Sequence, residues 1–171
     1  MRLRKLKPED APLMLEWMHD PGVVKDLQTN FSRKTLEDCE AFIRAASKSG
    51  EDLHYAIITD RDDEYLGTVS LKHLQPEQAE FAITIRKCAM GKGVSREAMS
   101  LILRYGFDRF GLKRIYWCVS PKNQRAVRFY DKNGYQRTAP PDRTEGYTPE
   151  QKKQYLWYEV RAGQIPEKKQ E

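Results

Sequence analysis

Hydrophobic and polar positions in the middle of the chain predict a strand, a turn and then a helix. Residues 79–85 alternate apolar side chains with polar or small ones, which is the period of two expected of a strand. The pattern breaks at the glycines of residues 90–93. From Glu97 to Phe107 apolar residues recur every three or four positions, which predicts a helix. The functional interpretation depends on this strand–turn–helix unit.

The rest of the chain alternates predicted strands with predicted helices. The other strands are expected at residues 3–6, 54–59, 65–71, 114–119 and 154–160, with a further one beginning at Tyr135. The other helices are expected to begin at Asp10, near Ser32 or Thr35, and at Asn123. Residues 23–31 are expected to be looser, and residues 138–153 to form an irregular loop with room for one helical turn. A hairpin followed by strands that helices separate predicts a mixed α/β or α+β fold.

Length and composition fit one domain. A chain of 171 residues, 39% of them hydrophobic, is long enough to bury one adequate core. We expect this domain to cover residues 1–161. Residues 162–171 are mostly polar and are expected to form a flexible C-terminal tail.

Charge and composition narrow the classes of function. The net charge of +5 suits an anionic ligand, but no basic stripe with interleaved aromatic residues indicates nucleic acid. The first residues lack the apolar run of a signal peptide, and no stretch approaches membrane-spanning length. The cysteines and histidines are dispersed, at positions Cys39, Cys88, Cys118, His19, His54 and His73. Their spacing indicates neither a disulfide framework nor a metal site, so we expect a cytoplasmic protein without a metal.

The turn before the long helix has the features of an anion site. The first N–H groups of a helix lack intrahelical partners and lie at the positive end of its dipole. Gly91 and Gly93 permit positive φ and let the backbone approach a phosphate closely. The spacing fits neither a Walker loop nor a dinucleotide fingerprint, in which Arg96 would replace the third glycine. Taken alone, the loop is equally well explained as a glycine-containing helix cap.

Two segments resemble motifs of the GNAT superfamily of acyl-CoA N-acyltransferases. The loop Met90–Ser95 is similar to [QR]-x-x-G-x-[GA]; it keeps the central Gly93 and departs from the motif at both ends. The block Asn123–Tyr135 resembles N-x-x-[AS]-x-x-[FL]-Y-x-K-x-G-[FY] at every position. The N-terminal stretch, which ends in Trp17-Met18-His19-Asp20-Pro21, resembles the ribosomal-protein alanine and spermidine acetyltransferase branch.

The resemblance implies a fold and a cofactor site. The fold would be a central, mostly antiparallel twisted sheet with helices on both faces and a V-shaped splay between the fourth and fifth strands. Acetyl-CoA would lie in the splay, with pantetheine paired to the backbone of the fourth strand and pyrophosphate on the loop N–H groups. The cofactor-binding residues implied are Ile83, Ile85, Met90, Gly91, Lys92, Gly93, Val94, Ser95, Asn123, Ala126, Tyr130 and Lys132. The outer phosphates would meet Lys92 and, after it, Arg86, Lys87 or Arg96.

The resemblance also implies a reaction, in which a primary amine attacks the thioester of acetyl-CoA directly. Tyr130 would protonate the departing thiolate, although a tyrosine on an apolar helix face is more often only packed. Asn123 has a similar alternative as a plain helix cap. Glu80 is our candidate acceptor of the amine's proton, and an outward-facing strand carboxylate is an equally weighted interpretation.

Substrate and assembly stay open at this point. The amine can belong to an amino sugar, a polyamine, a peptide N-terminus or an aminoglycoside-like molecule, and a homodimer is compatible with the sequence. A CoA-binding GNAT-like module without catalysis is the alternative function. Retention of Tyr130 in its motif favours an enzyme.

Overall fold

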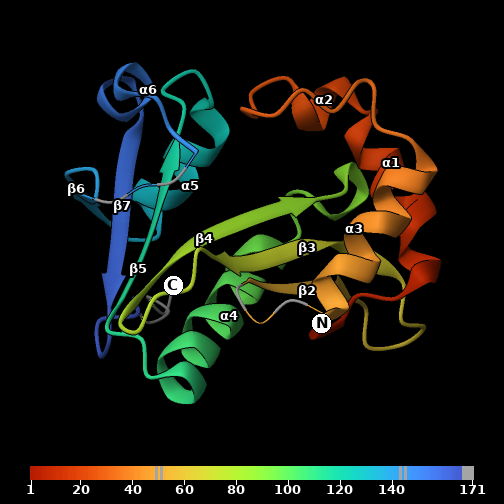
Figure 1. Ribbon diagram of the computed structural model, residues 1–171, viewed down its shortest axis with the longest axis horizontal. Helices are drawn as coiled ribbons and strands as arrows, with labels where there is room; N and C mark the ends of the chain where they lie inside the picture. The colour runs from red at the N-terminus through yellow and green to blue at the C-terminus, as the bar shows by residue number, and fades with distance from the viewer. Residues whose placement is uncertain (49, 51, 143, 145, 167–171) are drawn as a thin grey trace.

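A twisted sheet runs through the molecule in the strand order β1-β2-β3-β4-β5-β7-β6, as the ribbon shows (Figure 1). The computed structural model describes residues 1–48, 50, 52–142, 144 and 146–166, and its seven strands are counted within these residues. The strands are β1 (Arg2–Lys5), β2 (Leu53–Ile58), β3 (Tyr65–Lys72), β4 (Gln78–Ile85), β5 (Arg114–Val119), β6 (Gln136–Thr138) and β7 (Leu156–Arg161). The helices are α1 (Ala11–Met18), α2 (Pro21–Val24), α3 (Leu36–Lys48), α4 (Val94–Phe110), α5 (Gln124–Lys132) and α6 (Pro149–Gln154), with short 3₁₀ helices at Pro8–Asp10 and Lys87–Ala89.

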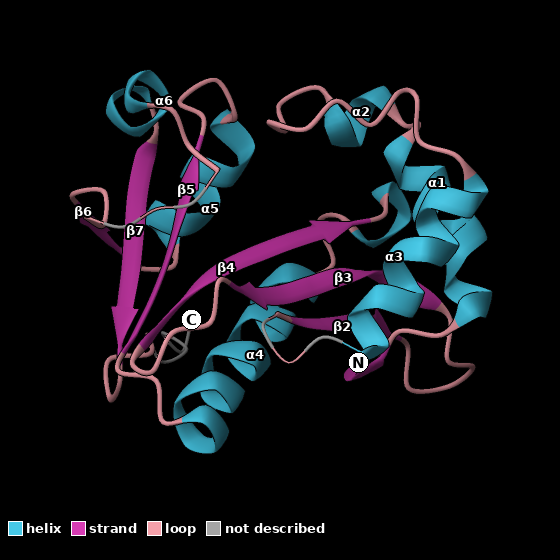
Figure 2. Ribbon diagram, viewed as in Figure 1, coloured by secondary structure: helices cyan, strands magenta, loops and turns pink. Residues whose placement is uncertain are grey.

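The strands β4 and β5 form the one parallel pair among the strands described, and they separate soon after they meet. Their register covers only Gln78 with Arg114, Ala79 with Ile115, and Glu80 with Tyr116. Beyond Glu80 the two strands diverge, as Figure 2 shows. All the other neighbouring strands pair antiparallel. The mostly antiparallel mixed sheet and the splay between the fourth and fifth strands are therefore confirmed.

Alternation along the strands supplies a core to each face of the sheet. On one face Phe81 and Ile85 of β4 join the helices α4 and α5 in one buried cluster. On the other face Ala56, Ile58 and Tyr65 pack with α1 and α3 in a second cluster. Because successive strand residues point to opposite faces, Glu80 lies on the face opposite Phe81.

Packing positions the long helix α4 closely against the sheet. A Cβ added to Gly106 would lie 2.9 Å from Leu71 and 3.0 Å from Ile115, which are residues of β3 and β5. The helix ends at Gly111, whose φ of 63° is favourable for glycine. α4 therefore spans the two strands on either side of β4, and its N-terminal end is held beside the splay.

A short helix, α2, follows α1 and overlaps the start of residues 23–31, the segment expected to be looser. Asp20 caps α2 by accepting a hydrogen bond from the Gly22 N–H at 2.8 Å, and Pro21 occupies the first helical position. Asp10 is the N-cap residue of α1, as expected, but its carboxylate makes no capping hydrogen bond to that helix. Asp10 instead accepts two hydrogen bonds from Arg4, at 2.7 and 2.8 Å, and one from the Lys7 N–H.

The end of the chain differs in detail from the expected pattern. Residues 149–154 form α6, which Thr148 caps, so the last strand starts at Leu156 and not at residue 154. The strand β7 lies between β5 and β6. In the region where a flexible tail is expected, the Ala162 N–H donates to the Lys113 carbonyl and Ile165 packs against the core. Residues 167–171 lie outside the described part, and the tail there stays a prediction.

Candidate active site

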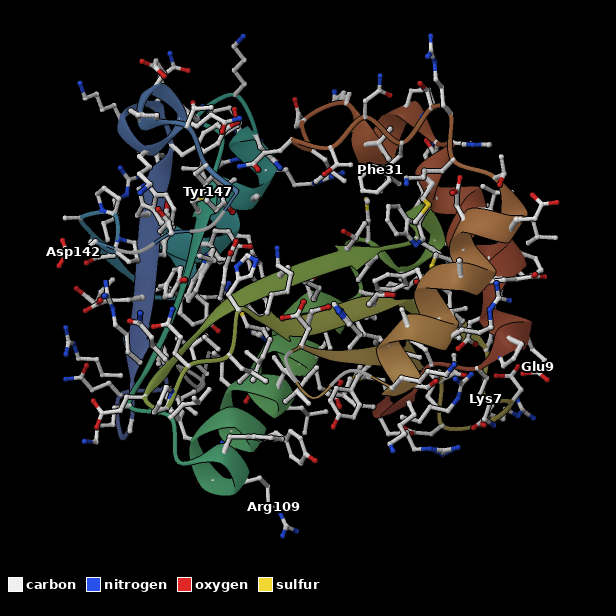
Figure 3. The ribbon with its side chains drawn as sticks, in the orientation of Figure 1. Lys7, Glu9, Phe31, Arg109, Asp142 and Tyr147 are labelled. Carbon is white, nitrogen blue, oxygen red and sulfur yellow. The ribbon has the colours of Figure 1, made fainter. Side chains whose placement is uncertain are left out.

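A groove of about 520 Å³ lies where β4 and β5 separate. Because the strands part, the groove is lined by side chains from both faces of the sheet and by the glycine loop, residues 90–95. One end is lined by the segment that follows α2, and Phe31 of that segment lies across the groove from Tyr147 (Figure 3). The residues of the predicted site that line it are Glu80, Ile83, Ile85, Met90, Gly91, Gly93, Val94, Ser95, Asn123, Ala126 and Tyr130.

The glycine loop has the geometry of an anion site at the start of α4. Gly91 and Gly93 have φ values of 74° and 79°, a region that glycine adopts without the strain that other residues incur. Nothing lies within 4 Å of where a Cβ would stand on either residue, so the backbone face is open. Gly93 is the N-cap of α4, and the next N–H groups lack intrahelical partners.

One edge of β4 is free beside the groove. Ile83 and Ile85 pair with Val69 and Gly67 of β3, whereas the described register with β5 stops at Glu80. A strand edge without a neighbour presents backbone N–H and C=O groups that an extended, amide-bearing ligand can pair with. This geometry fits the pantetheine position that the resemblance implies for these two residues.

Of the cationic side chains that the sequence named for the outer phosphates, Arg96 lines the groove and Lys92, Arg86 and Lys87 do not. Lys92 and Lys132 are exposed and lie outside the groove lining, so their contact with the cofactor stays a prediction. Arg86 is only 8% exposed and donates to Glu16 and Glu64, which uses its guanidinium within the fold. Its proposed contact with an outer phosphate is therefore unsupported.

Arg125 is a groove residue that sequence reasoning missed. It lines the groove with Arg96, and its Nη1 lies 3.0 Å from Sδ of Met90 and 3.4 Å from the Gly22 carbonyl oxygen. The guanidinium therefore reaches from α5 to the glycine loop. In the sequence it occupies a variable position of the Asn123–Tyr135 block, so its spacing carried no signal.

Tyr130 lies on α5 with its ring in an aromatic cluster. It is 7% exposed, and its ring centroid lies 5.2 Å from that of Trp117 and 5.1 Å from that of Tyr158. Burial raises the pKa of Tyr130 well above its usual value, so the phenol is protonated at neutral pH. Asn123 caps α5 by accepting a hydrogen bond from the Ala126 N–H at 3.1 Å. That cap fixes the start of the helix that carries Tyr130.

Glu80 is buried at the point where β4 and β5 part. Its residue is 3% exposed, so it is not an outward-facing strand carboxylate. Its Oε1 accepts a hydrogen bond of 2.5 Å from the Tyr147 hydroxyl and lies 3.6 Å from Nζ of Lys72. Its Oε2 lies 2.9 Å from Nδ1 of His73. The carboxylate therefore sits within a polar cluster on the face opposite the aromatic cluster of Tyr130.

Tyr147 is the second groove residue that sequence reasoning missed. It belongs to the segment expected to be an irregular loop, where nothing distinguished it from its neighbours. Its ring makes edge-on contacts with Trp157 and Tyr155, at centroid distances of 5.3 and 6.4 Å. Burial raises the pKa of Tyr147 above its usual value, and the nearby Cys118 and Glu80 raise it further. Tyr147 therefore keeps its proton at neutral pH and donates a hydrogen bond to Glu80.

These features define the class of protein, and comparison with known proteins identifies the family. Residues 1–136 match the family model described as "Acetyltransferase (GNAT) domain", so the chain belongs to the GNAT acetyltransferase family. The class predicted from the two motifs is thus confirmed. Among the described residues no helix combines the length and hydrophobicity needed to cross a bilayer.

Particular relatives lie in the same family. The "Uncharacterized N-acetyltransferase p20" of Bacillus licheniformis is 28% identical over 141 residues, which cover 80% of this chain and 79% of that protein. The spermidine N(1)-acetyltransferase of Escherichia coli K12 is 28% identical over 142 residues, which cover 79% and 72%. The crystal structure of spermidine N-acetyltransferase from Vibrio cholerae in complex with CoA and spermine superposes with a TM-score of 0.77 at 19% identity and covers 96% of each chain. That last likeness concerns the fold.

Proposed function

We propose that this protein transfers an acetyl group from acetyl-CoA to a primary amine, which attacks the thioester directly. The observation that carries the proposal is the groove at the splay. It joins the glycine loop and the free edge of β4 to two protonatable groups, Tyr130 and Glu80. A binding module needs the first two features, whereas a catalyst of acyl transfer also uses the last two.

The residues present fit acetyl-CoA. The open backbone at Gly91 and Gly93 suits pyrophosphate, and Arg96 and Arg125 supply positive charge beside it. The unpaired edge of β4 at Ile83 and Ile85 suits the amides of pantetheine. When bound, acetyl-CoA supplies an activated acyl group with a thiolate leaving group. The backbone N–H groups near Ile83 would polarise the thioester oxygen.

Tyr130 supplies the acid in this proposal. A thiolate with an ordinary thiol pKa of about 8.5 takes a proton from a phenol readily when the two are placed together. The raised pKa of Tyr130 keeps that proton on the phenol across the neutral range. Its packing against Trp117 restrains the ring of Tyr130, which lines the groove.

Glu80 accepts the proton that the amine loses. A lysine-like or polyamine amine with pKa about 10.4 is neutral at pH 7 in only about one molecule in 2,500, a cost of about 4.6 kcal/mol. An α-amino group with pKa about 8 costs only about 1.4 kcal/mol by the same arithmetic. A weak acceptor is therefore sufficient for an α-amine, and a polyamine makes the stronger demand on Glu80.

The test is a screen of primary amines with purified protein, in which CoA release is followed through its free thiol. Spermidine is included first because the name of the Escherichia coli relative assigns that substrate to that protein. We expect CoA release that depends on one class of amine and yields the N-acetylated product by mass spectrometry. Acetyl-CoA at 100 times its Kd should also stabilise the fold by about 2.7 kcal/mol. Stabilisation without turnover of any amine would indicate a non-catalytic CoA-binding module.

A further inference from the structure

Both oxygens of the Glu80 carboxylate already have partners in the structure. Oε1 is held by the Tyr147 hydroxyl and approached by Lys72, and Oε2 faces His73. With the carboxylate ionised, Nδ1 of His73 must carry a proton and donate it. Glu80 lines the groove but is only 3% exposed, so the surrounding groups cover most of it.

Only one of the surrounding groups is suited to receive a proton from the groove. Lys72 and Tyr147 line the groove, and the lysine ammonium has donors but no acceptor. A phenol hydroxyl donates one hydrogen bond and accepts another. Tyr147 already donates to Glu80, and its oxygen has two lone pairs, one of which is able to accept from the nearby Cys118 thiol while the other is able to accept from an amine.

We propose that Tyr147 is a further catalytic residue, which passes the proton of the acceptor amine to Glu80. The inference rests on the proposed function and adds to it the route that the proton takes. Tyr147 belongs to the segment that precedes α6, so this route depends on a residue outside both GNAT motifs.

The relay balances in protons and electron pairs. As the amine nitrogen bonds to the carbonyl carbon, it carries one proton in excess. That proton moves to the Tyr147 oxygen while the proton of Tyr147 moves to Oε1 of Glu80, so Tyr147 is unchanged. The carbon–sulfur bond breaks, its electron pair leaves with sulfur, and the thiolate takes the proton of Tyr130. Water then removes the proton from Glu80 and returns one to Tyr130.

Neighbouring side chains hold Tyr147 in place, which suits a residue that relays a proton. Its ring contacts Trp157 on β7 and Tyr155 at the end of α6, so two neighbouring aromatic residues restrain it. Lys72 and His73 restrain Glu80 from the other side. A hydrogen bond whose two ends are both restrained keeps its length while a substrate enters and leaves.

The main test removes one oxygen atom. Tyr147→Phe keeps the ring contacts with Trp157 and Tyr155, and single-turnover rates are measured with the best amine of the panel. We expect a loss of about 100-fold in the rate, in the range that a placed proton-transfer group contributes, with an unchanged Kd for acetyl-CoA. Tyr155→Phe is the matched control, because Tyr155 belongs to the same ring stack, and it should keep the wild-type rate. A loss of less than tenfold in Tyr147→Phe would overturn the relay, since the amine would then reach Glu80 directly.

A double mutant separates a relay from two independent effects. Residues that act as one unit are strongly non-additive. Glu80→Gln should lose about as much rate as Tyr147→Phe, and the double variant should lose no more than about threefold beyond either. Losses that multiply in the double variant would contradict the relay.

The wild-type protein distinguishes this inference from the function on which it rests. If the wild type turns over none of the amines in the panel, the proposed function fails and the relay fails with it. If the wild type is active and Tyr147→Phe is equally active, only the relay fails. Thermal melting of each variant, with and without acetyl-CoA, checks that the cofactor half of the groove is intact.

Discussion

The hydroxyl of Tyr147 and the carboxylate of Glu80 are 67 residues apart in the chain and share a hydrogen bond of 2.5 Å. Glu80 is the last residue of β4 that pairs with β5, and Tyr147 reaches it from the segment before α6. The polar side of the candidate active site is therefore assembled from both halves of the chain.

The glycine loop gives the first prediction. Gly93→Val places a branched side chain on the open backbone face and should abolish measurable acetyl-CoA binding by calorimetry, because the pyrophosphate can no longer approach. Gly111→Val is the matched control. Gly111 also has positive φ and open space around it, but it lies at the other end of α4. Both variants should lose some stability through backbone strain, and only Gly93→Val should lose the ligand. Equal acetyl-CoA affinities in the two folded variants would rule out the loop as the phosphate site.

Tyr130 gives the second prediction. Tyr130→Phe keeps the aromatic packing, so the Kd for acetyl-CoA should hardly change, while kcat and kcat/KM should fall equally by about 10²–10⁴-fold. Since a thiolate needs its proton less as pH rises past the thiol pKa of about 8.5, the deficit should shrink at alkaline pH. The measurement is a pH–rate profile with chemistry shown to be rate-limiting. More than about a third of the wild-type rate would mean that the phenol is only packed.

Two arginines give a paired prediction. Arg125→Met should weaken acetyl-CoA binding about tenfold or more without changing stability, because a charge-assisted hydrogen bond contributes about 1.5–3 kcal/mol and Arg125 is exposed in the groove. Arg86→Met should do the reverse. It breaks the contacts with Glu16 and Glu64 and should lower the free energy of unfolding by about 2 kcal/mol. Calorimetry should show a loss of acetyl-CoA affinity in Arg125→Met, and urea unfolding should show a loss of stability in Arg86→Met. The opposite assignment of the two losses would contradict the prediction.

The buried tyrosines predict a stability change at alkaline pH. Burial raises the pKa of Tyr65 and of Tyr135 to about 12, and both are protonated in the folded state when the unfolded chain ionises near pH 10. Their contribution is therefore complete below about pH 10 and is lost as pH rises toward 12. Tyr135→Phe should leave the free energy of unfolding unchanged at pH 7. Above pH 10 that free energy should decline less steeply with pH, by a slope equivalent to at most one bound proton. Unfolding curves between pH 9 and 11.5 provide the check, and an unchanged slope would contradict the assignment to Tyr135.

His73 gives the last prediction, as a positioning residue that acts through Glu80. Its φ of 50° is unusual for a residue with a side chain, and its backbone N–H donates to Asp52 at 2.7 Å. His73→Asn suits the same backbone conformation and removes the ring that holds Oε2. We expect a loss of about tenfold in the single-turnover rate in the wild-type background and no further loss in Glu80→Gln. A purely structural role would lower both backgrounds equally.

Sequence reasoning reached the parts of the fold that local patterns determine. The alternation at residues 79–85 predicted β4 and the glycine loop after it, and the resemblance of the Asn123–Tyr135 block to a GNAT motif implied the splay and Tyr130. The short helix α2 was missed although Asp20-Pro21 is a good helix start, because four residues carry no periodicity.

Long-range contacts account for the rest of the site. Arg86 looked like a phosphate ligand beside the glycine loop, and only the fold shows that Glu16 and Glu64 surround it. In the sequence, Tyr147 is one aromatic residue in a polar loop. The fold brings it into contact with Trp157 of β7 and into a hydrogen bond with Glu80. Neither contact produces a pattern that can be recognised in a few consecutive residues of the sequence.

The position of β7 between β5 and β6 has a consequence for how the protein folds. The strands β2, β3 and β4 pair with one another through short turns, whereas β5 pairs with β7 across residues 120–155, with Val119 opposite Leu156. Closing so long a loop before its contacts form is slow. We therefore expect the strands β2, β3 and β4 to pair early. The groove would be the last part to form, since Tyr130 and Tyr147 both lie inside that loop.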